Sequence, residues 1–128
     1  MTRAKRQAGE NPLFWVGSAK RDLLAFPAAV QHVLGTALSV AQFGGKHPAA
    51  KPWKGEGPGV YEIVADHRGD TFRTVYTVRF EKAIYVLHVF QKKSPRGVST
   101  RASDKALIAA RLRAARQAYE ENYGDTNE

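Results

Sequence analysis

The stretch TFRTVYTVRF, residues 71–80, alternates residue types in the way that a half-buried β-strand does. Side chains on a strand point alternately to its two faces. One face is apolar enough to pack against helices and carries Phe72, Thr74, Tyr76, Val78 and Phe80. The other face carries Arg73 and Arg79, so we expect this face to contact a charged group.

The flanking segments predict two further strands. VYEIVAD, residues 60–66, precedes the quoted stretch across the turn HRGD, and AIYVLHVFQKK, residues 83–93, follows it across a tight turn at Glu81 and Lys82. Strands joined by such short turns form an antiparallel meander. Residues 44–59 hold three prolines and five glycines, which predicts a loop.

The rest of the chain is expected to supply one more strand and the helices. A short apolar run at 13–18 predicts a strand, and helical spacing predicts helices at 19–26, 28–43 and 102–119. The expected fold class is α+β: an N-terminal strand and helical hairpin packed on a twisted antiparallel meander, with a C-terminal helix. We expect a disordered polar arm at 1–11, a single domain at 12–122 and a polar tail at 123–128.

The amino-acid composition limits the classes of function that the protein can have. The 128 residues contain no cysteine, which excludes disulfides and thiolate metal ligands. The N-terminus lacks the apolar core of a secretory signal, and no apolar run is long enough to cross a bilayer, so a cytoplasmic protein without a membrane partner is expected. Lysine and arginine number 20 against 12 acids, with the largest surplus in residues 44–97. Such a surplus attracts nucleic acid or another anion, although solubility alone also explains it.

Strand alternation places one group of charged and aromatic residues on a single face, provided that no β-bulge intervenes. We expect the opposite, apolar face to be covered by helices and this face to stay open. Ile84 and Val86 are also predicted to share it. Its charged and aromatic members are Glu62, Arg73, Arg79, His88, Phe90 and Lys92.

These residue types suit the cleavage of RNA. Arginine holds phosphate in bidentate fashion, and carboxylate or imidazole groups can move protons. Each residue also has a structural alternative: Arg73 can form a salt bridge with Glu62, His88 can be a hydrogen-bonded core residue, and Phe90 can simply pack. The histidines at 32, 47 and 67 have no spacing that suggests a metal site.

Three motifs follow one another along the chain: KPWKGEGPGVYEI at 51–63, TFRTVYTV at 71–78 and YVLHVFQKKS at 85–94. In this order they resemble the RelE/ParE superfamily of bacterial toxins, and in particular its HigB-like, phage-derived branch. The resemblance covers about residues 12–120, and no clear counterpart exists for the tyrosine that some relatives stack on the target base.

The resemblance implies a ribosome-dependent endoribonuclease that cuts mRNA in the A site without a metal or cofactor. It implies that Arg73 contacts the scissile phosphate, that Glu62 is a candidate base and that Lys92 and Lys93 act near the leaving group. The residue chemistry alone makes His88 another proton-transfer candidate. The RNA-binding candidates are Lys51, Lys54, Arg79, Phe90 and Arg96.

The implied partners are the ribosome, its mRNA and a helix-turn-helix, HigA-like antitoxin that binds the toxin in a hetero-oligomer. Two alternatives stay open. One is a ParE-like toxin that inhibits DNA gyrase without cleaving RNA, and the other is a phage-derived nucleic-acid-binding module without catalysis.

Overall fold

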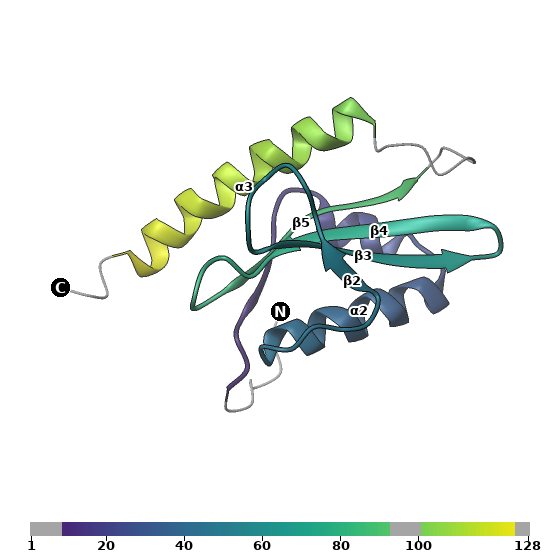
Figure 1. Ribbon diagram of the computed structural model, residues 1–128, viewed down its shortest axis with the longest axis horizontal. Helices are drawn as coiled ribbons and strands as arrows, with labels where there is room; N and C mark the ends of the chain where they lie inside the picture. The colour runs from purple at the N-terminus through teal and green to yellow at the C-terminus, as the bar shows by residue number, and fades with distance from the viewer. Residues whose placement is uncertain (1–8, 93–100, 125–128) are drawn as a thin grey trace.

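The computed structural model describes residues 9–92 and 101–124. The elements follow one another as β1 (Leu13–Trp15), α1 (Ala19–Leu24), α2 (Ala28–Gln42), β2 (Ala50–Pro52), β3 (Val60–His67), β4 (Asp70–Thr77), β5 (Ile84–Lys92) and α3 (Ala102–Tyr123). They form three layers, in which α1 and α2 pack on one face of a sheet and α3 packs on the other (Figure 1). The predicted α+β class is confirmed.

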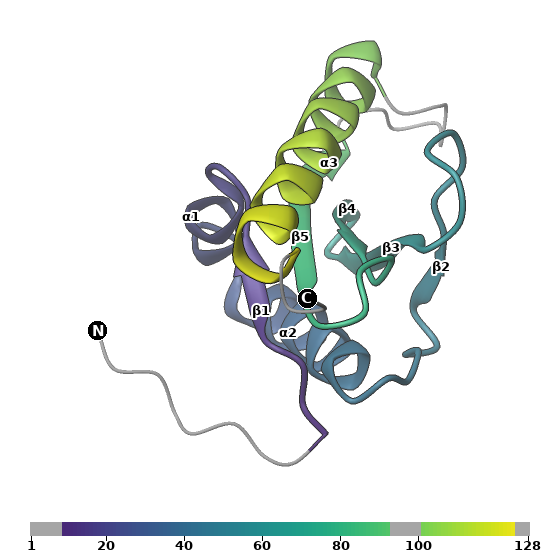
Figure 2. The ribbon, with the colours of Figure 1, turned by 90° about the vertical axis from the view of Figure 1, so that its left-hand side faces the viewer.

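The sheet has five strands in the order β1-β5-β4-β3-β2. The expected meander of β3, β4 and β5 is present and antiparallel, with Arg68 and Gly69 at positive φ in its first turn. The sheet is nevertheless mixed, because β1 runs parallel to β5. Sequence reasoning also missed β2, a three-residue strand inside the expected loop that pairs with β3 and forms the edge opposite β1 (Figure 2).

The first core lies between the sheet and the helices α1 and α2. Ile63, Phe72 and Tyr76 from the sheet are buried in one cluster with Leu34 and Leu38 from α2. These strand residues are the ones that alternation assigned to the helix-covered face, so that prediction is confirmed for them. At the start of the domain, the Asn11 backbone N–H donates to the Gln42 carbonyl at 2.8 Å, and the Gln42 side chain donates back to the Asn11 carbonyl.

The second core lies under α3, on the face that was expected to stay open. The expectation was wrong because α3 carries an apolar stripe and the opposite sheet face carries enough apolar side chains to match it. Ile108, Leu112 and Ala115 of α3 are buried in one cluster with sheet residues that include Val75 and Phe90. Only the part of this face that α3 leaves uncovered can serve as a site.

A β-bulge explains which residues face which core. Val75 pairs with His88, but the next residue of β4, Tyr76, pairs with Val86, so Leu87 is an extra residue in β5. The bulge inverts the faces of the residues that precede it. Ile84 and Val86 therefore pack in the first core, and the prediction that they share the charged face was wrong. Tyr85 and Leu87, predicted for the other face, pack under α3.

Beyond the bulge the predicted faces hold. Arg73 lies directly opposite Phe90, Val75 opposite His88, and Thr71 opposite Lys92.

In the described residues, no helix has the length and apolar composition of a membrane span.

Candidate functional site

The centre of the site is an ion pair between neighbouring strands. Arg73 of β4 and Glu62 of β3 are diagonal neighbours on the face that α3 shares, since Arg73 lies opposite Val64 and Glu62 opposite Val75. Arg73 Nη1 donates to Glu62 Oε1 at 2.6 Å, and the two side chains are 14% and 10% exposed. Arg73 Nε is buried and has no hydrogen-bond partner among the described residues. The salt bridge that the sequence offered as an alternative is therefore formed, and the guanidinium keeps donors to spare.

A pocket of about 450 Å³ opens beside this ion pair. Its lining combines the pair with residues from β2, the loop after β2 and α3: Lys51, Pro52, Trp53, Lys54 and Lys105. The strand β2 places Lys51 directly opposite Glu62. Among the described residues, four cationic side chains and a single carboxylate line the pocket, which makes it suited to a phosphate group.

Sequence reasoning found four of these lining residues and missed two others that matter. Lys51, Lys54, Glu62 and Arg73 were candidates, and the structure brings all four together. Trp53 was overlooked, although its position between two lysines was a usable signal. Lys105 left no signal in the sequence, because its place depends on α3 packing over the charged face.

Lys92, at the end of β5, lies in the electrostatic field of the same group. Partial burial lowers the pKa of Lys92, and the positive charges of Arg73 and Lys51 lower it further, whereas the Glu62 carboxylate acts in the opposite direction. A lysine whose pKa is lowered gives up a proton more readily than an ordinary one. Lys93, the other candidate near the leaving group, and Arg96, an RNA-binding candidate, lie outside the described residues.

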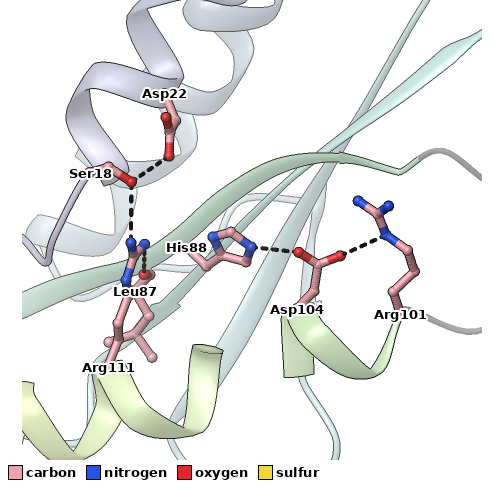
Figure 3. A network of polar contacts seen from close by, with 7 residues as sticks. All are labelled: Ser18, Asp22, Leu87, His88, Arg101, Asp104 and Arg111. Carbon is pink, nitrogen blue, oxygen red and sulfur yellow. Dashed lines mark hydrogen bonds and ion pairs between the residues drawn. The ribbon is translucent and has the colours of Figure 1, made fainter. Parts of the chain in front are cut away.

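His88 is buried beneath α3 and does not line the pocket. Figure 3 shows His88 and Arg101 both directed at Asp104 of α3. His88 Nε2 lies 2.8 Å from Asp104 Oδ1, and Arg101 Nε lies 3.5 Å from the other Asp104 oxygen. The His88 ring stacks on Phe90 with 4.6 Å between centroids, and within the part of the chain that the structure describes its Nδ1 has no hydrogen-bond partner. The geometry matches the structural alternatives for both residues: Phe90 is packed in the core, and His88 joins α3 to the sheet.

Arg111 is a second polar link between α3 and the body of the protein. Its guanidinium donates to the Leu87 carbonyl at 3.0 Å and to Ser18 Oγ at 3.2 Å, and Ser18 Oγ donates in turn to Asp22 (Figure 3). Gly17 leaves room for this guanidinium, because a Cβ there would lie 2.8 Å from Arg111 Nη2. Sequence reasoning gave no indication of this network, which joins residues far apart in the chain.

Arg79, expected on the same face as Arg73, is not among the residues that line the pocket beside Arg73. The strand β4 ends at Thr77, whose hydroxyl donates to the Gly59 carbonyl and accepts from the Arg79 backbone N–H. Beyond that point the Arg79 guanidinium turns to the loop before β3, where it donates to the carbonyls of Glu56 and Pro58. Arg79 therefore braces the loop that carries Lys54, and a direct contact with RNA stays a prediction.

Comparisons with known proteins give a family and a fold. The family model described as "Phage derived protein Gp49-like (DUF891)" matches residues 21–113. This chain is similar to a structure of the E. coli toxin RelE in its free state, in which two arginines are replaced by alanine. The two superpose with a TM-score of 0.59 at 19% sequence identity. The match covers 80% of this chain and 98% of that chain, so the fold is RelE-like. No curated protein matches the chain.

Proposed function

The chain belongs to the Gp49-like family of phage-derived proteins, and we propose that it is the toxin of a toxin–antitoxin pair, a ribosome-dependent endoribonuclease that cuts mRNA in the A site. The observation that carries the proposal is the pocket that joins Arg73 and Glu62 to three lysines. It combines the two requirements of RNA cleavage, which are positive charge around a phosphate and a group that accepts a proton.

In the proposed reaction Arg73 binds the scissile phosphate through the guanidinium donors that Glu62 leaves free. The Glu62 carboxylate removes the proton from the 2′-hydroxyl, and the 2′-oxygen attacks phosphorus. Lys51 and Lys54 stabilise the added negative charge as the phosphorus centre becomes five-coordinate. The bond to the 5′-oxygen breaks, the Lys92 ammonium protonates that oxygen, and the products are a 2′,3′-cyclic phosphate and a 5′-hydroxyl.

The roles of two candidates differ from those that the sequence offered. The buried pair of His88 with Asp104 supports a structural role for His88, so the proton transfers are assigned to Glu62 and Lys92. The lowered pKa of Lys92 supports its role as the acid, because a more acidic ammonium transfers its proton more readily at neutral pH. The RelE-like fold supports an antitoxin partner, which we propose is a helix-turn-helix, HigA-like protein in a cytoplasmic hetero-oligomer.

Toeprinting of mRNA during translation tests the proposal. Wild-type protein is expected to produce breaks in the A-site codon and to arrest growth when expressed alone. The Arg73→Ala variant is expected to do neither. Arg113→Ala is the matched control, because it removes an equal charge from an exposed position of α3 outside the pocket.

Other outcomes point to the alternatives. Intact mRNA together with gyrase-dependent double-strand DNA breaks contradicts the nuclease and supports a ParE-like toxin. Intact mRNA and intact DNA, with RNA binding retained, supports a non-catalytic module. Co-expression of the neighbouring open reading frame checks the partner, since an antitoxin restores growth and co-purifies with the protein.

A further inference from the structure

Lys105 is the lining residue of the pocket that comes from α3. The other lining residues come from the strands β2, β3 and β4 and from the loop after β2, whereas Lys105 comes from the start of α3. The lysines 51, 54 and 105 are all exposed, and within the described part of the chain none of them is paired with a carboxylate. Cationic side chains therefore reach the pocket from two separate parts of the fold, the sheet with its β2 loop and the helix α3.

The position of Lys105 is fixed by contacts on both sides of it along the helix. Asp104, the preceding residue, lies 2.8 Å from His88 Nε2. Ile108, one turn later, is fully buried in the second core. Arg111, almost two turns later, donates to the Leu87 carbonyl and to Ser18. The backbone that carries Lys105 is therefore held against β5 by one buried polar pair, one apolar contact and one charge-assisted link.

We propose that α3 is a fixed wall of the RNA pocket, in which Lys105 binds a backbone phosphate next to the one held by Arg73, and His88, Asp104 and Arg111 act as positioning residues for Lys105. The inference rests on the proposed function, because it assigns the pocket to single-stranded RNA. A strand with one phosphate on Arg73 and the neighbouring phosphate on Lys105 lies across the pocket, with Trp53 in its lining between two lysines.

The first test compares two variants of equal charge, Lys105→Ala and Arg113→Ala, in binding a fluorescent single-stranded RNA oligonucleotide whose 2′-hydroxyls are methylated to prevent cleavage. Lys105→Ala is expected to weaken binding about fivefold at about 0.1 M salt and to reduce the slope of log affinity against log salt by about 0.7, the value for one lost phosphate contact with a single strand. Arg113→Ala is expected to change neither. Equal behaviour of the two variants, or no binding by wild type, overturns the inference.

Hydrogen exchange of α3 with and without the same oligonucleotide gives a second readout. A fixed wall predicts slower exchange at residues 101–112 when RNA is bound. Faster exchange means that α3 leaves the sheet on binding, and unchanged exchange means that it does not meet the RNA. Either of these results overturns the inference.

The role of His88 is tested by cleavage kinetics on programmed ribosomes. Gln places its side-chain nitrogen near the position of the histidine Nε2 and can still donate to Asp104. His88→Gln is therefore expected to retain wild-type kcat and pH profile, while His88→Ala raises KM and leaves kcat within about threefold of wild type. A loss of kcat of about a hundredfold or more in both variants, the size expected for a lost acid or base, overturns the positioning role.

The controls separate this inference from the proposed function. If wild type fails to cut mRNA, or if Arg73→Ala cuts as well as wild type, the proposed function fails. If cleavage depends on Arg73 but Lys105→Ala behaves like Arg113→Ala, only the role of α3 fails.

Discussion

A double-mutant cycle on Glu62 and Arg73 reports directly on the electrostatics of the pocket. The perturbations are Glu62→Ala, Arg73→Ala and the double variant. Removal of one partner of a fully buried ion pair costs about 3–5 kcal/mol, because the other charge is left without compensation. Here the side chains are 14% and 10% exposed beside an open pocket, so water reduces this cost.

The two single variants are expected to differ. Arg73→Ala leaves the Glu62 carboxylate close to the lysines of the pocket, which partly compensate for the lost guanidinium. Glu62→Ala leaves Arg73 among those lysines with no carboxylate among the described residues that line the pocket. We therefore expect unfolding free energies lower by about 2 kcal/mol for Arg73→Ala, about 3 kcal/mol for Glu62→Ala and about 3.5 kcal/mol for the double variant, which gives a coupling of about 1.5 kcal/mol.

Urea denaturation followed by far-ultraviolet circular dichroism measures these values, and a second series at 1 M salt provides the control. Salt screens the exposed lysines more than the ion pair itself. The difference between the two single variants should therefore shrink at high salt, while most of the coupling stays. If the unfolding costs of the two single variants simply add, with a coupling below about 0.5 kcal/mol, Glu62 and Arg73 do not act as a coupled pair. If Glu62→Ala costs less than Arg73→Ala, the account of the pocket's charge is wrong.

Three further predictions concern the frame around the site. Burial, with a smaller contribution from Tyr61, raises the pKa of Tyr76 to about 12, so the folded state keeps a proton that the unfolded state releases from about pH 10 upward. The free energy of unfolding should therefore fall by up to about 1.4 kcal/mol per pH unit between about pH 10 and 12. Urea denaturation of Tyr76→Phe should show a shallower fall, and equal slopes for the two proteins would contradict the assignment. Gly59→Ala should lower the melting temperature more than Gly55→Ala. Both glycines have positive φ, but only at Gly59 would a Cβ lie 3.1 Å from the Arg79 backbone. Similar decreases in melting temperature for the two variants would show that this contact does not matter. Leu112→Ala should cost about 2–5 kcal/mol in the same denaturation assay, and a loss below about 1 kcal/mol would show that α3 is only loosely packed.

The sequence predicted the central meander and the shared face of Glu62 and Arg73 because these depend on local pattern. Strict alternation in 71–77 and the short turns on either side define the meander, and they place Arg73 and Glu62 on one face irrespective of the rest of the fold. The bulge at Leu87 could not be predicted in this way. A residue inserted into a run of apolar side chains leaves the composition of the strand unchanged, while it exchanges the faces of Ile84 and Val86 with those of Tyr85 and Leu87.

The features that were missed depend on contacts between distant segments. The strand β2 exists because three residues of a proline- and glycine-rich loop pair with β3, and Arg79 turns to that loop because β4 ends at Thr77. The helical spacing of α3 predicted a buried stripe without showing which sheet face would receive it. Its packing on the charged face buries His88 and Phe90 and brings Lys105 to the pocket.

The most direct test of the central claim is the rate of mRNA cleavage on ribosomes that carry a defined codon in the A site, measured with enzyme in excess. The account predicts site-specific cleavage by wild type and a rate at least about a hundredfold lower for Arg73→Ala, while Arg113→Ala cleaves at the wild-type rate. Cleavage by Arg73→Ala at the wild-type rate would contradict the claim that the pocket beside Arg73 is the catalytic site.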